Sequence, residues 1–253
     1  MVFTLSLLSF FVVLRRIAFI GVGISHSALG GVALGLVLGL NETIVTTLFC
    51  TGVALTIGFI SRKGHLREDT AIGITFAGTM AFGIALIALK GGYLSSLFSF
   101  LFGSIVSITA NDIAAMAIYC GVTTAIIALL FKGFLQASFD EEVAKAAGVP
   151  VEALHYLLLV LISISIVASI KLVGIILVSA LLVLPAATAY QIVQTYRKLI
   201  ALSVVFGILS LLLGLFLSYR FDLPPGATIV LCGCIVFFVC FLLSPRRRKR
   251  GGA

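Results

Sequence analysis

The sequence lacks tryptophan and is poor in charge, because Asp, Glu, Lys and Arg together make up only 10% of its 253 residues. A soluble domain carries about 25% charged residues to keep its surface hydrated. Hydrophobic residues make up 61% of this chain, and its mean hydropathy is +1.28. The shortage of charge and the excess of apolar residues together exclude a soluble globular domain and indicate a polytopic membrane protein.

Acidic residues are also scarce, and each of the nine lies at or near the end of an apolar stretch. An ion-driven secondary transporter needs acidic groups within the membrane, so this class is a weaker alternative. An intramembrane enzyme is weaker still, because the sequence has neither a GxSxG nor an HExxH motif. Ser25 and Ser27 flank His26, but adjacent helix positions diverge by about 100°, so His26 cannot readily serve either serine as a base.

The five cysteines do not form a disulfide framework, since all of them lie inside apolar runs and are predicted to be small buried hydrophobes. Cys232 and Cys234 are two residues apart, which on a helix separates them by about 200°. The pair therefore cannot hold one metal ion.

Polar residues divide the chain into nine apolar pieces. A helix that spans the membrane needs roughly 20 residues. The pieces cover residues 1–14, 20–40, 43–60, 70–89, 113–131, 155–170, 172–189, 200–219 and 226–243. They predict an all-α transmembrane bundle of about 8–9 spans in a single domain, 1–253. The first piece reaches only about 21 Å, so either an upstream stretch is missing or this helix does not cross fully. A further apolar piece, 97–108, is predicted to be interfacial or re-entrant.

Basic residues set the orientation of the bundle. With the tail inside, 14 of the 17 Lys and Arg residues fall on the cytoplasmic side. The basic run 246–250, within a tail at 244–253, lies beside apolar helices, which indicates a cytoplasmic anchor and not a nucleic-acid site. His65 and His155 fall near inner span ends and are predicted to be structural or solvated.

His26 lies ten residues beyond Arg16, which places it about 15 Å above the cytoplasmic edge and near the membrane midplane. An ionisable group at this depth marks a pathway or site, and neutral imidazole is a common metal ligand. The alternative is that His26 bonds a carbonyl or serine of another helix as polar glue.

Helical periodicity gives this span two faces. The face with His26 is predicted to line a translocation path and includes Val22, Gly30 and Ala33. The opposite face forms a doubled small-xxx-small pattern for close helix packing, made of Gly31, Gly35 and Gly39.

The longest inner loop, 132–156, is predicted to hold a short helix over residues 139–147. Ser138 and Glu141 have the spacing of a capping box, and Gly148 followed by Pro150 would end the helix. Its small apolar interior could dock into a partner's groove, although an interfacial helix on lipid headgroups is an alternative.

Four stretches of the sequence, 14–35, 139–150, 171–189 and 222–230, resemble in that order the permease subunit of zinc, manganese and iron type ABC importers. The resemblance implies a homodimer of permease subunits in the bacterial inner membrane, with the C-terminus cytoplasmic. It also implies two cytoplasmic ATPases that bind ATP, an extracytoplasmic metal-binding protein, and no hydrolysis by the permease itself. The transported divalent ion would pass His26, and the loop helix would be the coupling helix that contacts the ATPase through Asp140, Glu141, Glu142, Ala144, Ala147 and Gly148.

The family pairs its histidine with an acidic residue four positions earlier, and Val22 stands at that position here. Two His26 side chains in a dimer fall short of the four ligands that hold zinc tightly. Weak coordination can still suit conduction, because an ion that is held too tightly does not leave. The uncharged path also keeps a larger ligand, such as a metal chelate, as an alternative substrate.

Overall fold

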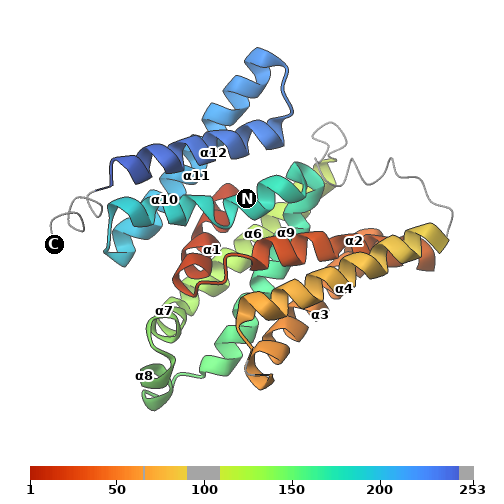
Figure 1. Ribbon diagram of the computed structural model, residues 1–253, viewed down its shortest axis with the longest axis horizontal. Helices are drawn as coiled ribbons and strands as arrows, with labels where there is room; N and C mark the ends of the chain where they lie inside the picture. Colours follow the sequence, from red (N-terminus) through yellow and green to blue (C-terminus); the bar gives the residue numbers. More distant parts are fainter. Residues whose placement is uncertain (65, 90–108, 245–253) are drawn as a thin grey trace.

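The computed structural model describes residues 1–64, 66–89 and 109–244, and every regular element in these ranges is a helix (Figure 1). The interfacial piece predicted at 97–108, the basic run 246–250 and His65 lie outside the described residues. The helices are α1 (Val2–Leu14), α2 (Ile20–Leu38), α3 (Glu42–Lys63), α4 (Glu68–Leu89), α6 (Ala110–Leu129), α7 (Phe131–Phe139), α8 (Glu141–Ala146), α9 (Val151–Leu181), α10 (Leu184–Ile192), α11 (Tyr196–Phe221) and α12 (Pro225–Leu242).

The described residues contain eight helical segments long and apolar enough to cross a membrane, which confirms the predicted all-α polytopic bundle. These are Ile20–Leu38, Glu42–Lys63, Glu68–Leu89, Asp112–Leu129, Val151–Ile170, Leu172–Ile192, Tyr196–Phe221 and Pro225–Leu242. Each coincides with a predicted span. α1 is shorter, with 13 residues, as its sequence indicated.

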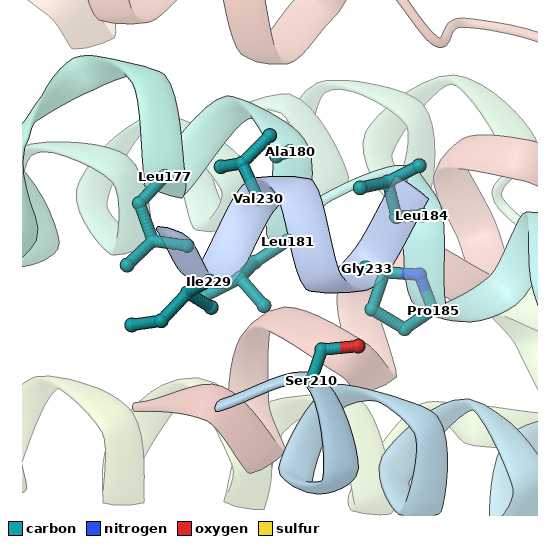
Figure 2. A pocket seen from close by; sticks show the side chains of 9 residues that line it. All are labelled: Leu177, Ala180, Leu181, Leu184, Pro185, Ser210, Ile229, Val230 and Gly233. Carbon is teal, nitrogen blue, oxygen red and sulfur yellow. The ribbon is translucent and has the colours of Figure 1, made fainter. Parts of the chain in front are cut away.

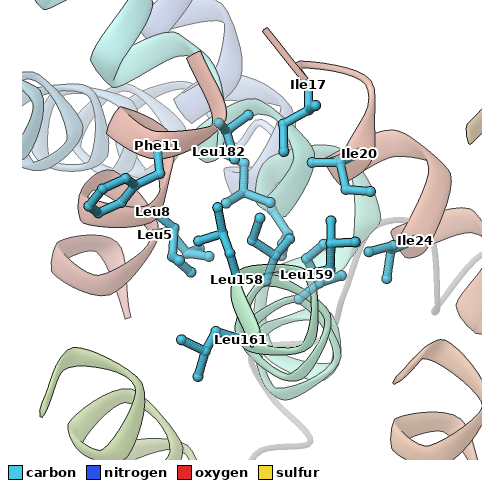
Figure 3. Packing of buried hydrophobic residues seen from close by; sticks show 14 of the residues in the cluster. Leu5, Leu8, Phe11, Ile17, Ile20, Ile24, Leu158, Leu159, Leu161 and Leu182 are labelled. Carbon is cyan, nitrogen blue, oxygen red and sulfur yellow. The ribbon is translucent and has the colours of Figure 1, made fainter. Parts of the chain in front are cut away.

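α1 lies inside the bundle and is buried on all sides from Thr4 to Val12. Its side chains Leu5, Leu8 and Phe11 pack together with Leu158 of α9 and Ile20 of α2 in the hydrophobic core (Figure 3). Protein and not lipid therefore surrounds residues 4–12 of this helix.

α9 doubles back on itself at Gly174, where φ is 77° and ψ is 168°. His155 near its start contacts Arg15, and Ser179 near its end contacts Gly21. In a straight helix, positions 155 and 179 would lie about 36 Å apart, whereas Arg15 and Gly21 are only six residues apart. The two predicted spans 155–170 and 172–189 are therefore the arms of one helical hairpin, and Gly174 supplies the left-handed φ that its turn needs.

The helix is interrupted a second time between α9 and α10, at Leu182 and Val183. Pro185 then occupies the first turn of α10, where its missing N–H group is not needed.

Candidate functional site

Small residues hold α2 tightly against α3. A Cβ atom on Gly31 would lie 2.7 Å from the Cα atom of Thr46, and one on Gly35 would lie 3.1 Å from the Cα atom of Glu42. Gly31 and Gly35 therefore have the packing role predicted for them. Gly39 does not share it, because a Cβ atom there would meet nothing within 4 Å. Its φ of 67° instead ends α2 with a left-handed cap.

α4 covers a second side of α2, which the sequence had assigned to the translocation path. A Cβ atom on Gly30 would lie 2.9 Å from the carbonyl oxygen of Thr79. Ala33 is 1% exposed. Gly30 and Ala33 are thus buried between helices and line no open path. Periodicity defined the angle of this face correctly, but it could not show that a neighbouring helix would cover it.

His26 and Val22 remain at the edge of this contact, His26 half-buried and Val22 exposed. His26 is three residues before Leu29, the middle residue of α2, a distance of about 4.5 Å along the axis. Its ring meets the ring of Phe76 on α4 edge to face, with centroids 5.4 Å apart. The imidazole is therefore near mid-helix on the outer side of the α2–α4 contact.

The His26 ring is held by its own helix. Its Nδ1 atom lies 2.9 Å from the carbonyl oxygen of Val22, an acceptor to which only a protonated ring nitrogen can donate. In the neutral ring, Nδ1–H leaves the Nε2 lone pair available for a metal ion. The contact is within α2, so it does not join His26 to a second helix as polar glue would.

The serines beside His26 point elsewhere. The Ser25 hydroxyl lies 2.9 Å from that of Ser179 on α9, and the Ser27 hydroxyl lies 2.6 Å from that of Thr79 on α4. The three consecutive side chains of α2 thus face three directions, as their helical spacing predicted. Their arrangement offers His26 no hydroxyl to activate.

Within the described residues, no group of three or more His, Cys, Asp or Glu side chains could hold a metal ion. A separate hollow between α9, α10, α11 and α12 is lined by apolar residues such as Leu177, Leu184 and Ile229, with the hydroxyl of Ser210 at its edge (Figure 2). Its lining suits neither an ion nor a charged substrate.

The loop helix predicted over residues 139–147 corresponds to α8, which starts two residues later than predicted. α7 runs to Phe139, and α8 then begins at Glu141 with Asp140 as its N-cap, whose Oδ1 atom accepts hydrogen bonds from the N–H groups of Glu142 and Val143. The predicted capping box of Ser138 with Glu141 is wrong, because Ser138 lies in the last turn of α7 and its hydroxyl donates to the Phe134 carbonyl oxygen. Gly148 does end α8, with φ at +81°.

The residues predicted to contact an ATPase differ in their exposure and in the direction of their side chains. Asp140, Glu142, Ala147 and Gly148 are exposed, as is Val143, which was not in the predicted set and has 65% of its surface exposed. Ala144 faces inward and packs against Ala137 and Val151, so it fixes α8 to the bundle and offers no surface to a partner. Glu141 turns back toward α3, where its Oε1 atom accepts a hydrogen bond from Arg62 Nη2 at 3.0 Å.

A buried polar cluster at this end of the bundle was missed at the level of sequence. Arg15, which follows α1, donates from Nε to the Ser138 hydroxyl at 3.0 Å and from Nη1 to His155 Nδ1 at 3.1 Å. Glu68, the first residue of α4, has its Oε1 atom 3.8 Å from His155 Nδ1. The sequence analysis used the basic residues only to set orientation, and the acidic residues beside them, such as Glu68 and Asp69 after Arg67, were the available signal.

The model of the ABC 3 transport family matches residues 1–244 of the chain. The chain belongs to the ABC 3 transport family. Among curated proteins, the chain is 39% identical over 237 residues to the manganese transport system membrane protein MntC of Listeria monocytogenes, covering 94% of this chain and 84% of that protein. It is 38% identical over 240 residues to the manganese import system permease protein ScaB of Streptococcus parasanguinis, covering 94% of this chain and 85% of that protein.

A solved structure shares the fold of this ABC 3 family member. PsaBC from Streptococcus pneumoniae in complex with Fab superposes with a TM-score of 0.84 at 37% identity, covering 98% of this chain and 89% of that chain. These findings confirm a multi-pass permease subunit of a metal-ion ABC importer. ATP hydrolysis belongs to a separate subunit, so this chain is not an enzyme.

Proposed function

We propose that this ABC 3 permease moves manganese(II) inward across a bacterial cytoplasmic membrane, past His26, when a partner ATPase drives a conformational change. The manganese permeases to which the chain is similar support the choice of metal. The observation that carries the proposal is His26 itself, a half-buried imidazole near mid-helix whose Nδ1 is bonded and whose Nε2 faces away from that bond. Manganese accepts nitrogen and oxygen ligands, and water can fill its remaining positions.

A second copy of the chain would complete the path. α4 leaves a row of small residues exposed next to Phe76, the ring that touches His26, namely Gly73, Ala77, Ala81 and Ala85. Small residues at every fourth position let another membrane helix approach closely. A twofold dimer through this row would set two His26 rings beside one shared lumen. One imidazole from each copy binds an ion weakly enough to release it inward.

The exposed surface of α8 would contact the ATPase. Val143 and Ala147 give it an apolar patch, and Asp140 and Glu142 give it an acidic edge. This surface requires α8 to lie in the cytoplasm, which agrees with the distribution of Lys and Arg and sets the C-terminus inside. A binding protein would then deliver manganese at the opposite, outer face.

An uptake assay tests the proposal. The permease, co-expressed with its genomic neighbours, is reconstituted in liposomes and supplied with manganese(II), with zinc(II), iron(II) or a metal chelate as competitor. His26→Ala should reduce manganese uptake at least about tenfold through loss of a ligand. Leu38→Ala, which trims an exposed side chain on another side of α2, should leave uptake unchanged. Equal uptake by wild type and His26→Ala, or preference for the chelate over the free ion, would contradict the proposal.

A further inference from the structure

The contact between Arg62 and Glu141 joins two parts of the protein that are far apart in sequence. Arg62 lies in the last turn of α3, and Glu141 is the first residue of α8. The side chain of Arg62 is 20% exposed and that of Glu141 is 44% exposed. The apolar contacts of α8, through Ala144, are with α7 and α9. The ion pair therefore connects α8 to a third helix, α3.

α3 leads from this ion pair to the helix that carries His26. The Cys50 thiol of α3 lies 3.8 Å from the Ile24 carbonyl oxygen of α2, two residues from His26. Further along, Thr46 meets α2 at Gly31 with almost no space between the two backbones. Cys50 is twelve residues from Arg62, about 18 Å along a rigid helix. α3 therefore connects the Arg62 end of the bundle to the α2 backbone near His26.

The buried polar groups near the Arg62–Glu141 ion pair include atoms that could form further hydrogen bonds. Arg62 Nε, Arg15 Nη2, Asp69 Oδ1 and His155 Nε2 are buried and have no hydrogen-bond partner among the described residues. Burial lowers the pKa of Arg15, and the carboxylates of Glu141 and Glu68 act in the opposite direction. These unpartnered donors and this acceptor could form a second set of hydrogen bonds if α8 moved. An element that transmits movement needs two such discrete arrangements.

We propose that the Arg62–Glu141 ion pair is a positioning contact that passes movement of α8 to α3 and from there to α2. This inference rests on the proposed docking of an ATPase at α8 and assigns Glu141 an internal role in place of contact with the ATPase. Glu141 is the more exposed partner, and ion pairs with an exposed member contribute little to folding, so reversing one charge should not unfold the bundle. The pair can then be tested for coupling separately from stability.

Charge reversal in the complete transporter tests the ion pair. The permease, its ATPase and its binding protein are reconstituted, and manganese uptake and ATP hydrolysis are measured together. Arg62→Glu and Glu141→Arg should each keep the ATPase bound, while the number of ions moved per ATP hydrolysed falls about fivefold or more. The double variant restores the opposite charges and should return this ratio to within about twofold of wild type. Lys63→Glu makes the same charge change on the exposed neighbour of Arg62 and should leave the ratio unchanged.

Two results would overturn the inference while leaving the proposed function intact. In one, the single reversals transport with the same ratio as Lys63→Glu. In the other, the double variant is as poorly coupled as the single variants. A wild-type complex from which no ATPase co-purifies would instead contradict the proposed function itself, and the inference with it.

Discussion

Gly30 of α2 and Gly83 of α4 cross so closely that a Cβ atom on Gly83 would lie 2.9 Å from the Cα atom of Gly30. This crossing keeps Phe76 against His26 and sets the position of α4 beside the imidazole. The contact is between backbones, so neither helix can yield by rotating a side chain. The geometry around His26 consequently depends on the absence of one methyl group.

Gly83→Ala should therefore destabilise the permease by about 1–3 kcal/mol, because overpacking exceeds the gain in helix propensity. Gly52→Ala is the matched control, since a Cβ atom on Gly52 in α3 would meet nothing within 4 Å. That variant should be as stable as wild type or up to about 1 kcal/mol more stable. Thermal unfolding in detergent compares the two, and equal melting temperatures would show that the α2–α4 crossing is looser than described.

Val22→Asp should tighten manganese binding. Val22 is exposed one turn before His26 on the same side of α2, so a carboxylate there would add an oxygen ligand of the type that manganese prefers. The KM for manganese uptake should fall by roughly tenfold. Val22→Asn has a similar shape without the charge and should have a smaller effect. A KM unchanged in both variants would place the ion path away from this side of α2.

Gly148 should control how well α8 binds an ATPase. Its φ of +81° costs an ordinary residue about 1 kcal/mol or more, whereas asparagine tolerates this conformation better than alanine does. Gly148→Ala should weaken association with the ATPase about fivefold, and Gly148→Asn should weaken it less. Co-purification over a range of concentrations measures both. A larger loss of association in Gly148→Asn than in Gly148→Ala would mean that docking does not depend on the left-handed residue that ends α8.

Much of the fold was predictable because hydropathy acts locally along the chain. The spans, the shortness of α1 and the close packing at Gly31 and Gly35 all followed from composition and periodicity within single segments. The glycine that ends α2, Gly39, was misassigned because its spacing continues the Gly31–Gly35 pattern beyond the point where the helix stops.

The remaining features depend on contacts between segments. Gly30 and Ala33 were assigned to the path because periodicity gives an angle around α2 and not the identity of its neighbours. The capping box failed because α7 extends through Ser138, which leaves Asp140 as the first residue free to cap α8. The link from Arg62 to Glu141 joins positions 79 residues apart, and no local pattern encodes it.

His26 contributes its Nε2 atom to the proposed manganese site. Manganese(II) is paramagnetic, and electron–nuclear double resonance on the permease–ATPase complex, prepared without the binding protein, detects nitrogen bonded to it directly. Wild type should show an imidazole nitrogen coupling that disappears in His26→Ala, while the His155→Gln variant should retain it. An identical nitrogen signal in wild type and His26→Ala, or no nitrogen signal in manganese-loaded wild type, would show that manganese does not bind His26.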